Sequence, residues 1–321
     1  MNHIFDDMTT DEQKKWWFEQ AQSALKALNV EADRLEWLAY THNAVFSVIS
    51  HDSVTVLRLS LAENALQIQS ERDILQCFSQ AGLNVPTPIH SIETDSISGV
   101  LLSYIEGDSP QPDSVTVAEM AKIGAFIANL HQTQIDNTIH RHRLDWDGLY
   151  AETGIYYPNA ENMAVFTDEQ LAVMTAVTNL VKSAMDELGE TASEFGIIHG
   201  DFLLKNILFH EGDIHALDFE YCGWGYYLYD LTPLLWQLKP QARYAKLEQA
   251  LWEGYTSIRP LTKKHRNLLE TFIAGRQVAS MRWIVANQQN PYIVGKVDAI
   301  LAQRTAELST FLDTGILKRE G

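Results

Sequence analysis

Two short segments in the second half of the chain carry side chains that suit a hard metal ion. The first runs from His199 to Asp201 and reaches Asn206 five positions after the aspartate. The second reads Leu217-Asp218-Phe219-Glu220. Mg²⁺ prefers oxygen ligands such as these carboxylate and amide groups, keeps several waters and takes its remaining ligands from phosphate. The residue types therefore predict a magnesium site formed by both segments.

The residues around these segments predict a β-hairpin that brings them together. Ile207–Phe209 and Ile214–Leu217 are apolar runs separated by the turn Glu211–Asp213. Two strand-like runs joined by a short glycine-containing turn are typical of a hairpin. It would place Asp201, which has no obvious ion-pair partner in the sequence, at one end together with the asparagine and the second aspartate.

The order and spacing of these residues match a known pattern. Asp-x-x-x-x-Asn followed by Asp-Phe resembles the catalytic loop and metal-binding aspartate of protein kinases. With His-Gly-Asp at 199–201 and Asp-Phe-Glu at 218–220, the chain is more similar to the aminoglycoside phosphotransferase and choline kinase family. The resemblance is strong from 197 to 230 and weaker in the N-terminal part. Without it, the two segments would also fit a buried acidic hairpin turn with structural hydrogen bonds.

The resemblance implies a role for each of these polar residues. Asp201 would be the catalytic residue, accepting the proton of the acceptor hydroxyl or orienting that hydroxyl. Asn206 and Asp218 would be the metal ligands and would hold one or two Mg²⁺ ions. Glu220 would act on the metal directly or through water, or it would be a solvated carboxylate at the end of a strand.

The family resemblance also assigns nucleotide binding to the N-terminal part. Arg58 stands where protein kinases have a lysine, and its planar guanidinium suits phosphate. Glu71 on the following helix would be its acidic partner in preference to Glu63, the alternative being an ordinary surface salt bridge. No Gly-x-Gly-x-x-Gly is present, and the turn between the first two strands reads Thr41-His42-Asn43-Ala44.

The segment Ser103-Tyr104-Ile105 resembles the hinge of the family, whose backbone hydrogen-bonds adenine or guanine. The phosphoryl donor would then be ATP or GTP. Without the resemblance, these residues would form an edge strand that enters a linker. No Gly-x-x-x-x-Gly-Lys-Ser/Thr occurs, which excludes a P-loop kinase.

Several other polar residues are expected to be structural. His131 and His199 are interpreted as hydrogen-bonding residues of the core, and Asp230 as support for the catalytic region. His140 and His142 form a His-x-His pair without a nearby cysteine or carboxylate cluster. We therefore expect a basic surface loop there and not a metal site.

Hydrophobic periodicity predicts an α+β protein in which a small N-terminal antiparallel-sheet lobe precedes a large, mainly helical lobe. Thr9 and Glu12 have capping-box spacing and would open a helix through about Asn29. Strands are expected at 35–40, 44–49, 54–59, 89–93 and 99–105, around a helix at 62–80. Helices are expected at 115–131, 166–187, 231–238, 241–255, 264–286 and 296–312. We expect a bilobal protein-kinase-like fold with a nucleotide-clamping lobe at 1–105 and a catalytic, substrate-binding lobe at 106–321.

Composition limits the class of partner. The net charge of −18 disfavours nucleic acid and anionic membrane surfaces, so we expect neither as a partner. It would favour a cationic substrate, or it is a solubility device. The acidic N-terminus is unlike a signal peptide, arginines interrupt the apolar stretch near 272–286, and the two cysteines suggest no disulfide framework. A cytoplasmic protein is expected.

The function that follows from the resemblance is a Mg-dependent transfer of the γ-phosphate of ATP or GTP to a hydroxyl group of a small molecule. Aromatic residues could form a cation–π surface for an aminoglycoside- or choline-like acceptor, or they pack in the core. They are Trp146, Tyr156, Tyr157, Tyr221, Trp224, Tyr226 and Tyr227. Two alternatives stay open: a nucleotide-binding or regulatory protein with little turnover, and a bacterial protein Ser/Thr kinase of the same branch.

Overall fold

The computed structural model describes residues 5, 8–40, 43–51, 53–290 and 292–319. Its contacts divide the chain into two compact units. Unit 1 comprises residues 1–107, 135–140 and 215–217, and unit 2 comprises residues 108–134, 141–214 and 218–321. The predicted boundary between functional lobes at residues 105 and 106 stays a prediction. Of the predicted turn at 41–44, Thr41 and His42 lie outside the described residues.

Unit 1 is built on a five-stranded antiparallel sheet with the strand order β1-β2-β3-β5-β4. The strands are β1 (Arg34–Tyr40), β2 (Ala44–Ser50), β3 (Ser53–Leu61), β4 (Pro88–Glu93) and β5 (Ile97–Ser103). In β2 the alternate residues Phe46 and Val48 are completely buried, as expected when one face of a strand packs on the core. Strand β5 is buried along nearly its whole length, so both of its faces are covered.

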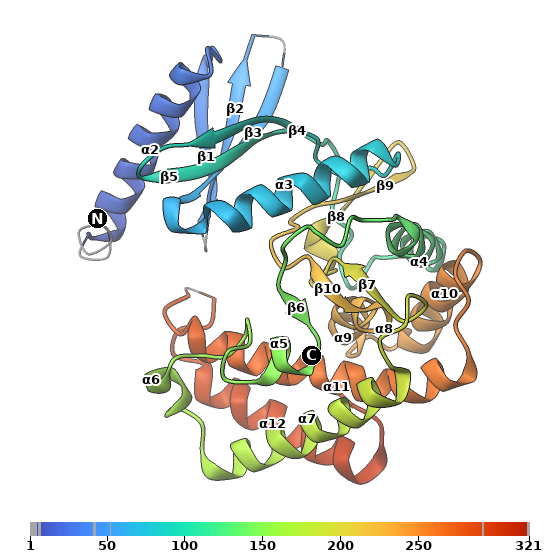
Figure 1. Ribbon diagram of the computed structural model, residues 1–321. Coiled ribbons are helices and arrows are strands. Elements are labelled where there is room, and N and C mark those ends of the chain that lie inside the picture. Colours follow the sequence, from blue (N-terminus) through green and yellow to red (C-terminus); the bar gives the residue numbers. More distant parts are fainter. Residues whose placement is uncertain (1–4, 6–7, 41–42, 52, 291, 320–321) are drawn as a thin grey trace. The chain divides into compact units, whose positions relative to one another are not determined.

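Two helices complete unit 1 (Figure 1). Helix α2 (Thr10–Ala27) begins with the predicted capping box between Thr9 and Glu12 and packs Trp17 and Ala21 onto the apolar residues of the sheet. Helix α3 (Ala65–Gln80) follows the 3₁₀ turn η1 (Ala62–Asn64) and contacts β3, β4 and β5.

Unit 2 is mainly helical. Each of the six helices predicted for this part is present, with ends within three residues of those expected: α4 (Val117–Gln132), α7 (Asp168–Leu188), α9 (Thr232–Leu238), α10 (Tyr244–Thr256), α11 (Lys263–Ala286) and α12 (Val297–Thr314). Three shorter helices were not predicted: α5 (Trp146–Tyr150), α6 (Ala160–Met163) and α8 (Tyr227–Asp230). In the described part of the chain, no helix has both the length and the apolar composition that a membrane span requires.

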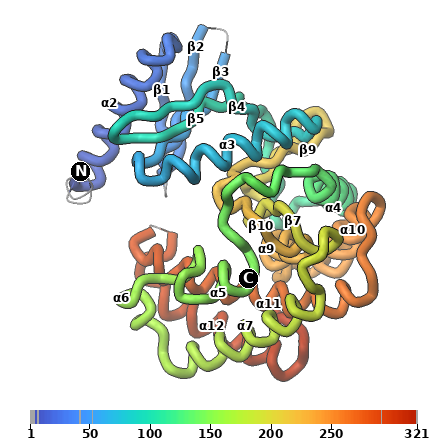
Figure 2. Tube along the Cα trace, viewed as in Figure 1, coloured from blue at the N-terminus to red at the C-terminus, as the bar shows by residue number. Residues whose placement is uncertain are grey.

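Helices α4 and α10 lie side by side and approach closely at two glycines (Figure 2). A Cβ atom on Gly124 of α4 would lie 2.1 Å from the carbonyl oxygen of Leu251, and one on Gly254 of α10 would lie 1.9 Å from that of Ala121. Only glycine fits at such a crossing, because any side chain would overlap the facing backbone. Helix α11 is buried over most of its length and contacts α7, α9 and α12.

Two small sheets carry the predicted motifs. The predicted hairpin is present as β8 (Ile207–His210) and β9 (Asp213–Ala216), which follow the 3₁₀ turn η2 (Leu204–Asn206). A second sheet, which was not predicted in full, has the order β6-β10-β7, with β6 (Arg143–Leu144), β10 (Gly223–Tyr226) and β7 (Phe195–Ile198). Strand β7 leads directly into the His-Gly-Asp turn. The α+β class and the antiparallel N-terminal sheet expected from the sequence are therefore confirmed.

Candidate active site

The turn that carries Asp201 is held by a buried carboxylate. Asp230, at the end of α8, is completely buried and accepts hydrogen bonds from the backbone N–H of His199 (2.9 Å) and of Gly200 (2.7 Å). Its Oδ2 also lies 3.0 Å from Nε2 of His131 on α4. Gly200 has a φ of +81°, which glycine adopts without strain. The structural roles predicted for Asp230 and His131 are confirmed.

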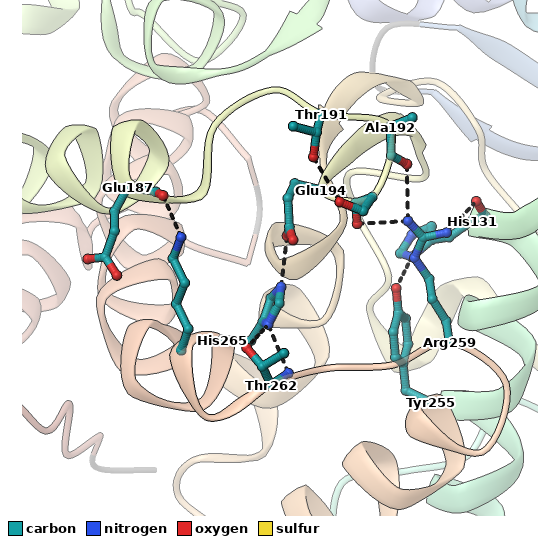
Figure 3. Close-up of polar contacts among 11 residues, drawn as sticks. His131, Glu187, Thr191, Ala192, Glu194, Tyr255, Arg259, Thr262 and His265 are labelled. Carbon is teal, nitrogen blue, oxygen red and sulfur yellow. Dashed lines mark hydrogen bonds and ion pairs between the residues drawn. The ribbon is translucent and has the colours of Figure 1, made fainter.

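The side chains of Arg259 and His265 hold the segment that precedes β7 (Figure 3). Nδ1 of His131 lies 2.8 Å from the hydroxyl of Tyr255, and Nε2 of His265 lies 2.7 Å from the carboxylate of Glu194. Arg259 donates to the carbonyl oxygens of Ser193 (2.8 Å) and Ala192 (3.3 Å). Burial lowers the pKa of His131 and outweighs the opposing effect of Asp230. Its ring is therefore neutral at physiological pH.

Asp201 has a partner that the sequence did not reveal. Its Oδ1 accepts a hydrogen bond of 2.6 Å from Nη2 of Arg276 on α11, and both side chains are only 9% exposed. Nη1 of Arg276 lies 3.3 Å from the hydroxyl of Tyr156. The expectation of a carboxylate without a partner is therefore wrong. The only signal in the sequence is an arginine inside an apolar helical run, because a buried charge requires a partner.

The Arg276 side chain is a charged guanidinium in the interior of unit 2. Burial alone would lower its pKa, but the Asp201 carboxylate and the Tyr156 hydroxyl raise the pKa well above the usual range of arginine. A planar guanidinium offers fixed donor directions to a carboxylate. Arg276 therefore sets the orientation of the Asp201 carboxylate.

Asn206 is placed to present its amide oxygen as a ligand. Its Nδ2 donates to the backbone oxygen of Asp201 (2.9 Å) and to Oδ2 of Asp201 (3.3 Å). No donor among the described residues reaches Oδ1 of Asn206, although the side chain is largely buried. The amide nitrogen is thus used to hold Asp201, and the oxygen is available to a cation.

Asp218 follows β9 and has a φ of +62°, a left-handed conformation that few residues other than glycine adopt. It is exposed, and its carboxylate makes no ion pair or hydrogen bond within the described ranges. The β8–β9 hairpin brings the chain back from Asn206 to Asp218. Burial raises the pKa of Tyr221, and the negative charges of Glu220, Asp201 and Asp218 add to this increase.

These residues fit a magnesium ion that also binds phosphate. One exposed carboxylate and one amide oxygen supply two hard ligands, and Mg²⁺ completes its shell with water and phosphate oxygens. The residues that the structure describes contain no group of three or more His, Cys, Asp or Glu side chains that could hold a metal. Two protein oxygens leave most of the Mg²⁺ shell to water and phosphate, so this donor set suits a metal bound together with a phosphorylated ligand.

The structure contradicts the surface-loop prediction for His142. Its Nε2 donates to the backbone oxygen of Tyr221 (2.9 Å), and residue 142 immediately precedes β6. Burial, followed by the positive charge of Arg141, lowers the pKa of His142 to about 4. The ring is therefore neutral and takes part in the folded structure.

In unit 1 the two residues assigned to phosphate binding lie in contact. Arg58 on β3 donates through Nη1 to Oε1 of Glu71 on α3, and both residues are buried, with exposures of 7% and 4%. The alternative of a surface salt bridge is thereby excluded. When the amide of Asn43 is oriented to satisfy its neighbours, its oxygen accepts from Nη2 of Arg58 (2.7 Å). The nucleotide role of the pair stays a prediction.

The predicted hinge begins where β5 ends. Ser103 still pairs with Thr87, through its N–H to the Thr87 oxygen (2.9 Å) and through its Oγ, which accepts from the Thr87 N–H (2.8 Å). Residues 104–107 make no backbone hydrogen bond with any described residue, and the Tyr104 side chain is exposed. Tyr104 and Ile105 therefore have backbone donors and acceptors available for a ligand.

The seven candidate aromatic residues do not gather on one surface. Tyr156 stacks on Tyr221 with ring centroids 5.3 Å apart, beside Arg276. Others contact cations of the chain itself: Lys182 lies over Trp146, Arg282 over Tyr157 and Arg259 over Tyr227. Tyr226 packs against Phe195 and Phe272. Most of these rings therefore pack within unit 2, and the Tyr156–Tyr221 pair is the part that lies near Asp201.

Curated relatives to which the chain is similar include homoserine kinases and ethanolamine kinases. The chain is 25% identical over 218 residues to a homoserine kinase of Gluconacetobacter diazotrophicus, which covers 63% of this chain and 64% of that protein. It is 26% identical over 147 residues to ethanolamine kinase 1 of Mus musculus, covering 42% of this chain and 38% of the mouse protein. The matches thus span less than two thirds of these relatives.

Solved structures share the fold across almost the whole chain. A microcompartment-associated aminopropanol kinase superposes with a TM-score of 0.76 at 21% identity, over 93% of this chain and 99% of that one. An amicoumacin kinase in complex with AMP-PNP, Ca²⁺ and Ami has a TM-score of 0.76 at 17% identity, over 98% of both chains. The protein-kinase-like fold expected from the sequence is thereby confirmed. Residues 39–261 match the model of the phosphotransferase enzyme family, which is more than half of the chain, and the protein therefore belongs to that family.

Proposed function

We propose that the protein transfers the γ-phosphate of ATP or GTP to a hydroxyl group of a small alcohol in the presence of Mg²⁺. The observation that carries this proposal is the buried Asp201 carboxylate, held by Arg276 and Asn206 next to the hairpin that leads to Asp218. Phosphoryl transfer needs a positioned acceptor and compensation of phosphate charge more than covalent chemistry by the protein. These residues supply both requirements.

Asp201 is assigned to the acceptor hydroxyl. Each carboxylate oxygen has two lone pairs, so an oxygen that accepts from Arg276 or Asn206 retains capacity for a further donor. A hydroxyl at about 2.6–3.2 Å would be within hydrogen-bond reach. Asp201 then orients the hydroxyl oxygen toward the phosphorus and takes up its proton as the new bond forms.

Asn206 and Asp218 are assigned to the metal. Bound Mg²⁺ would offset the negative charge of the phosphate groups. The left-handed backbone of Asp218 and the hydrogen bonds of the Asn206 amide fix the directions of the two ligand oxygens. Glu220 is half-buried close to Asp218 in the chain, and we assign it no direct role.

The nucleotide is assigned to unit 1. Arg58 carries the positive charge for a phosphate group, and Glu71 keeps its guanidinium in place. The backbone of Ser103, Tyr104 and Ile105 would hydrogen-bond the base, which is consistent with the open donors and acceptors after β5. ATP and GTP both meet these requirements.

The acceptor is proposed to be a small alcohol, as in the homoserine and ethanolamine kinases to which the chain is similar. The Tyr156–Tyr221 stack supplies an aromatic wall close to Asp201. Because Arg276 neutralises the charge of Asp201, attraction of a cationic group at this point is reduced. Selection of a cation would therefore depend on the aromatic faces and on the overall charge of −18.

The test is phosphoryl transfer from labelled ATP and GTP to homoserine, ethanolamine, choline, aminopropanol, aminoglycosides and sugars, with Mg²⁺ or with EDTA. We expect a phosphorylated product that requires Mg²⁺ and disappears in Asp201→Asn. Asp213→Asn is the matched control, because Asp213 is an exposed aspartate of the neighbouring β8–β9 hairpin. If nucleotide raises the melting temperature but no acceptor is phosphorylated, the result would favour a nucleotide-binding protein with little turnover. Transfer by Asp201→Asn at the wild-type rate would contradict the proposed role of Asp201.

A further inference from the structure

The chain that follows Asp218 is held by two neighbouring side chains from a distant part of the sequence. The carbonyl oxygens of residues 219, 220, 221 and 222 all accept hydrogen bonds from Arg141 and His142. Arg141 donates through Nη2 to Phe219 (3.2 Å) and Glu220 (2.6 Å), and through Nε to Cys222 (2.6 Å). His142 donates through Nε2 to Tyr221 (2.9 Å). We call this set of contacts the carbonyl clamp.

Side-chain donors supplement a single turn hydrogen bond in this segment. Residues 217–222 belong to no strand or helix, and the Cys222 N–H donates to the Phe219 carbonyl oxygen across a turn (3.1 Å). Phe219 and Cys222 are buried, with exposures of 1% and 0%. Because a buried carbonyl without a donor is costly, Arg141 and His142 stabilise the conformation of this segment together with the turn.

The two donor residues are themselves fixed to the next strand. The N–H of Trp224 donates to the carbonyl oxygen of His142 (3.0 Å), and β6 then runs parallel to β10 from Arg143. A Cβ atom on Gly223 would lie 2.5 Å from that same carbonyl oxygen, so the close approach requires glycine. The Arg141 side chain is buried, and its planar fork reaches several acceptors at once.

We propose that Arg141, with His142, is a positioning residue for the metal ligand Asp218. This inference rests on the proposed function, in which Asp218 binds Mg²⁺. Asp218 has a left-handed backbone and no partner of its own among the described side chains, and the carbonyl clamp holds the carbonyl oxygen of the next residue, Phe219. The clamp therefore sets the direction in which the Asp218 carboxylate points. Arg141 acts through the backbone and touches neither metal nor substrate.

The experiment measures metal binding directly. Mn²⁺ is titrated into the full-length protein with AMP-PNP, and free Mn²⁺ is followed by electron paramagnetic resonance. Arg141→Met should raise the Kd for Mn²⁺ by about 10- to 100-fold, the range seen when groups behind a metal ligand are removed. The Kd of Arg141→Lys for Mn²⁺ should lie between those of Arg141→Met and the wild type, because one ammonium group reaches fewer of the three carbonyl oxygens.

Arg282→Met is the matched control. Arg282 is similarly buried, at 8% exposure against 6% for Arg141, and it also donates to two backbone carbonyl oxygens, those of Leu149 and Tyr150. Loss of the Arg282 guanidinium should lower the melting temperature. The Kd for Mn²⁺ should stay within about twofold of the wild-type value, because the 10- to 100-fold increase is expected only for groups that support a metal ligand. Equal weakening by both variants would show a general loss of stability and would overturn the inference.

A second readout applies to metal-free protein. Hydrogen–deuterium exchange of residues 217–224 should be faster in Arg141→Met and Arg141→Lys than in the wild type, and unchanged in Arg282→Met. If Arg141→Met does not fold, both the Kd for Mn²⁺ and the exchange rate are measured on Arg141→Lys. Unchanged exchange and an unchanged Kd in a folded Arg141 variant would refute the inference.

The outcomes separate this inference from the proposed function. If the wild type binds Mn²⁺ through Asp218 but phosphorylates no alcohol, the phosphotransferase proposal fails while the positioning role stands. If Asp218→Asn binds Mn²⁺ as tightly as the wild type, Asp218 is not a ligand and the positioning role falls. If Arg141 variants bind Mn²⁺ normally in an active enzyme, only the positioning role is refuted.

Discussion

Replacing Arg276 by methionine removes the positive charge beside Asp201 and keeps most of the side-chain volume. The two groups lie 2.6 Å apart, and each side chain is 9% exposed. Removing one member of a buried ion pair leaves the other charge unpaired and destabilises a protein by about 3–5 kcal/mol. A loss of about 4 kcal/mol corresponds to a fall in melting temperature of about 6 °C for a chain of 321 residues.

The same substitution should reduce phosphoryl transfer independently of stability. Without Arg276, the Asn206 amide at 3.3 Å is the one side-chain donor left to the Asp201 carboxylate among the described residues. A displacement of about 1 Å in a catalytic group costs on the order of 100-fold in rate. We therefore expect kcat to fall by about that factor below the melting temperature, with a smaller change in the KM for nucleotide.

A double-mutant cycle distinguishes the two effects. Asp201→Asn and Arg276→Met should each lower stability, and the double variant should recover part of the loss because no buried charge is left alone. Stability comes from urea denaturation, and rates come from labelled phosphate transfer. The reasoning is refuted if Arg276→Met is as stable and as active as the wild type, or if the double variant is destabilised by the sum of the two single losses.

Three further predictions concern other parts of the chain. The folded pKa of His142, about 4, lies below its usual 6.5, so the unfolded state binds more protons and stability falls as pH decreases from about 6.5 to about 4. This difference between the folded and unfolded pKa values corresponds to about 3 kcal/mol of stability. Urea denaturation at several pH values should show that the stability of His142→Gln depends less on pH than that of the wild type. Arg58→Met should raise the Kd for nucleotide by about 10- to 100-fold in calorimetry through loss of a charged hydrogen bond, whereas Glu63→Gln, at an exposed position, should not. Gly124→Ala should destabilise the protein by about 1–3 kcal/mol, measured by urea denaturation, because its methyl group would overlap the Leu251 carbonyl.

Local sequence patterns were sufficient for much of the fold and of the candidate site. The β8–β9 hairpin, the capping box at Thr9 and the helices of unit 2 all depend on periodicity and on turn residues within a few positions. The pairing of Arg58 with Glu71 was expected from the family resemblance, and the two residues are in contact in the structure. Such features are local or follow a known motif.

The features that sequence reasoning missed depend on long-range contacts. Arg276 lies 75 residues from Asp201, and within its apolar helix it indicated only that the helix does not span a membrane. Arg141 and His142 lie about 80 residues from the carbonyl groups that they bind, in a stretch that reads as a polar loop. Main-chain acceptors have no sequence signature, because every residue carries one. The aromatic residues were misleading for the same reason, since their distribution over unit 2 is set by tertiary packing.

Asp230 joins the catalytic turn to the interior of unit 2, and this affects when the turn can open. Its two oxygens bind the N–H groups of His199 and Gly200, and the carboxylate is completely buried next to His131 of α4. Because their acceptor is fully buried, we expect these two N–H groups to exchange with solvent slowly, and only when the packing around α4 opens. The turn is therefore formed before any ligand arrives, and binding does not have to supply the entropy of ordering it.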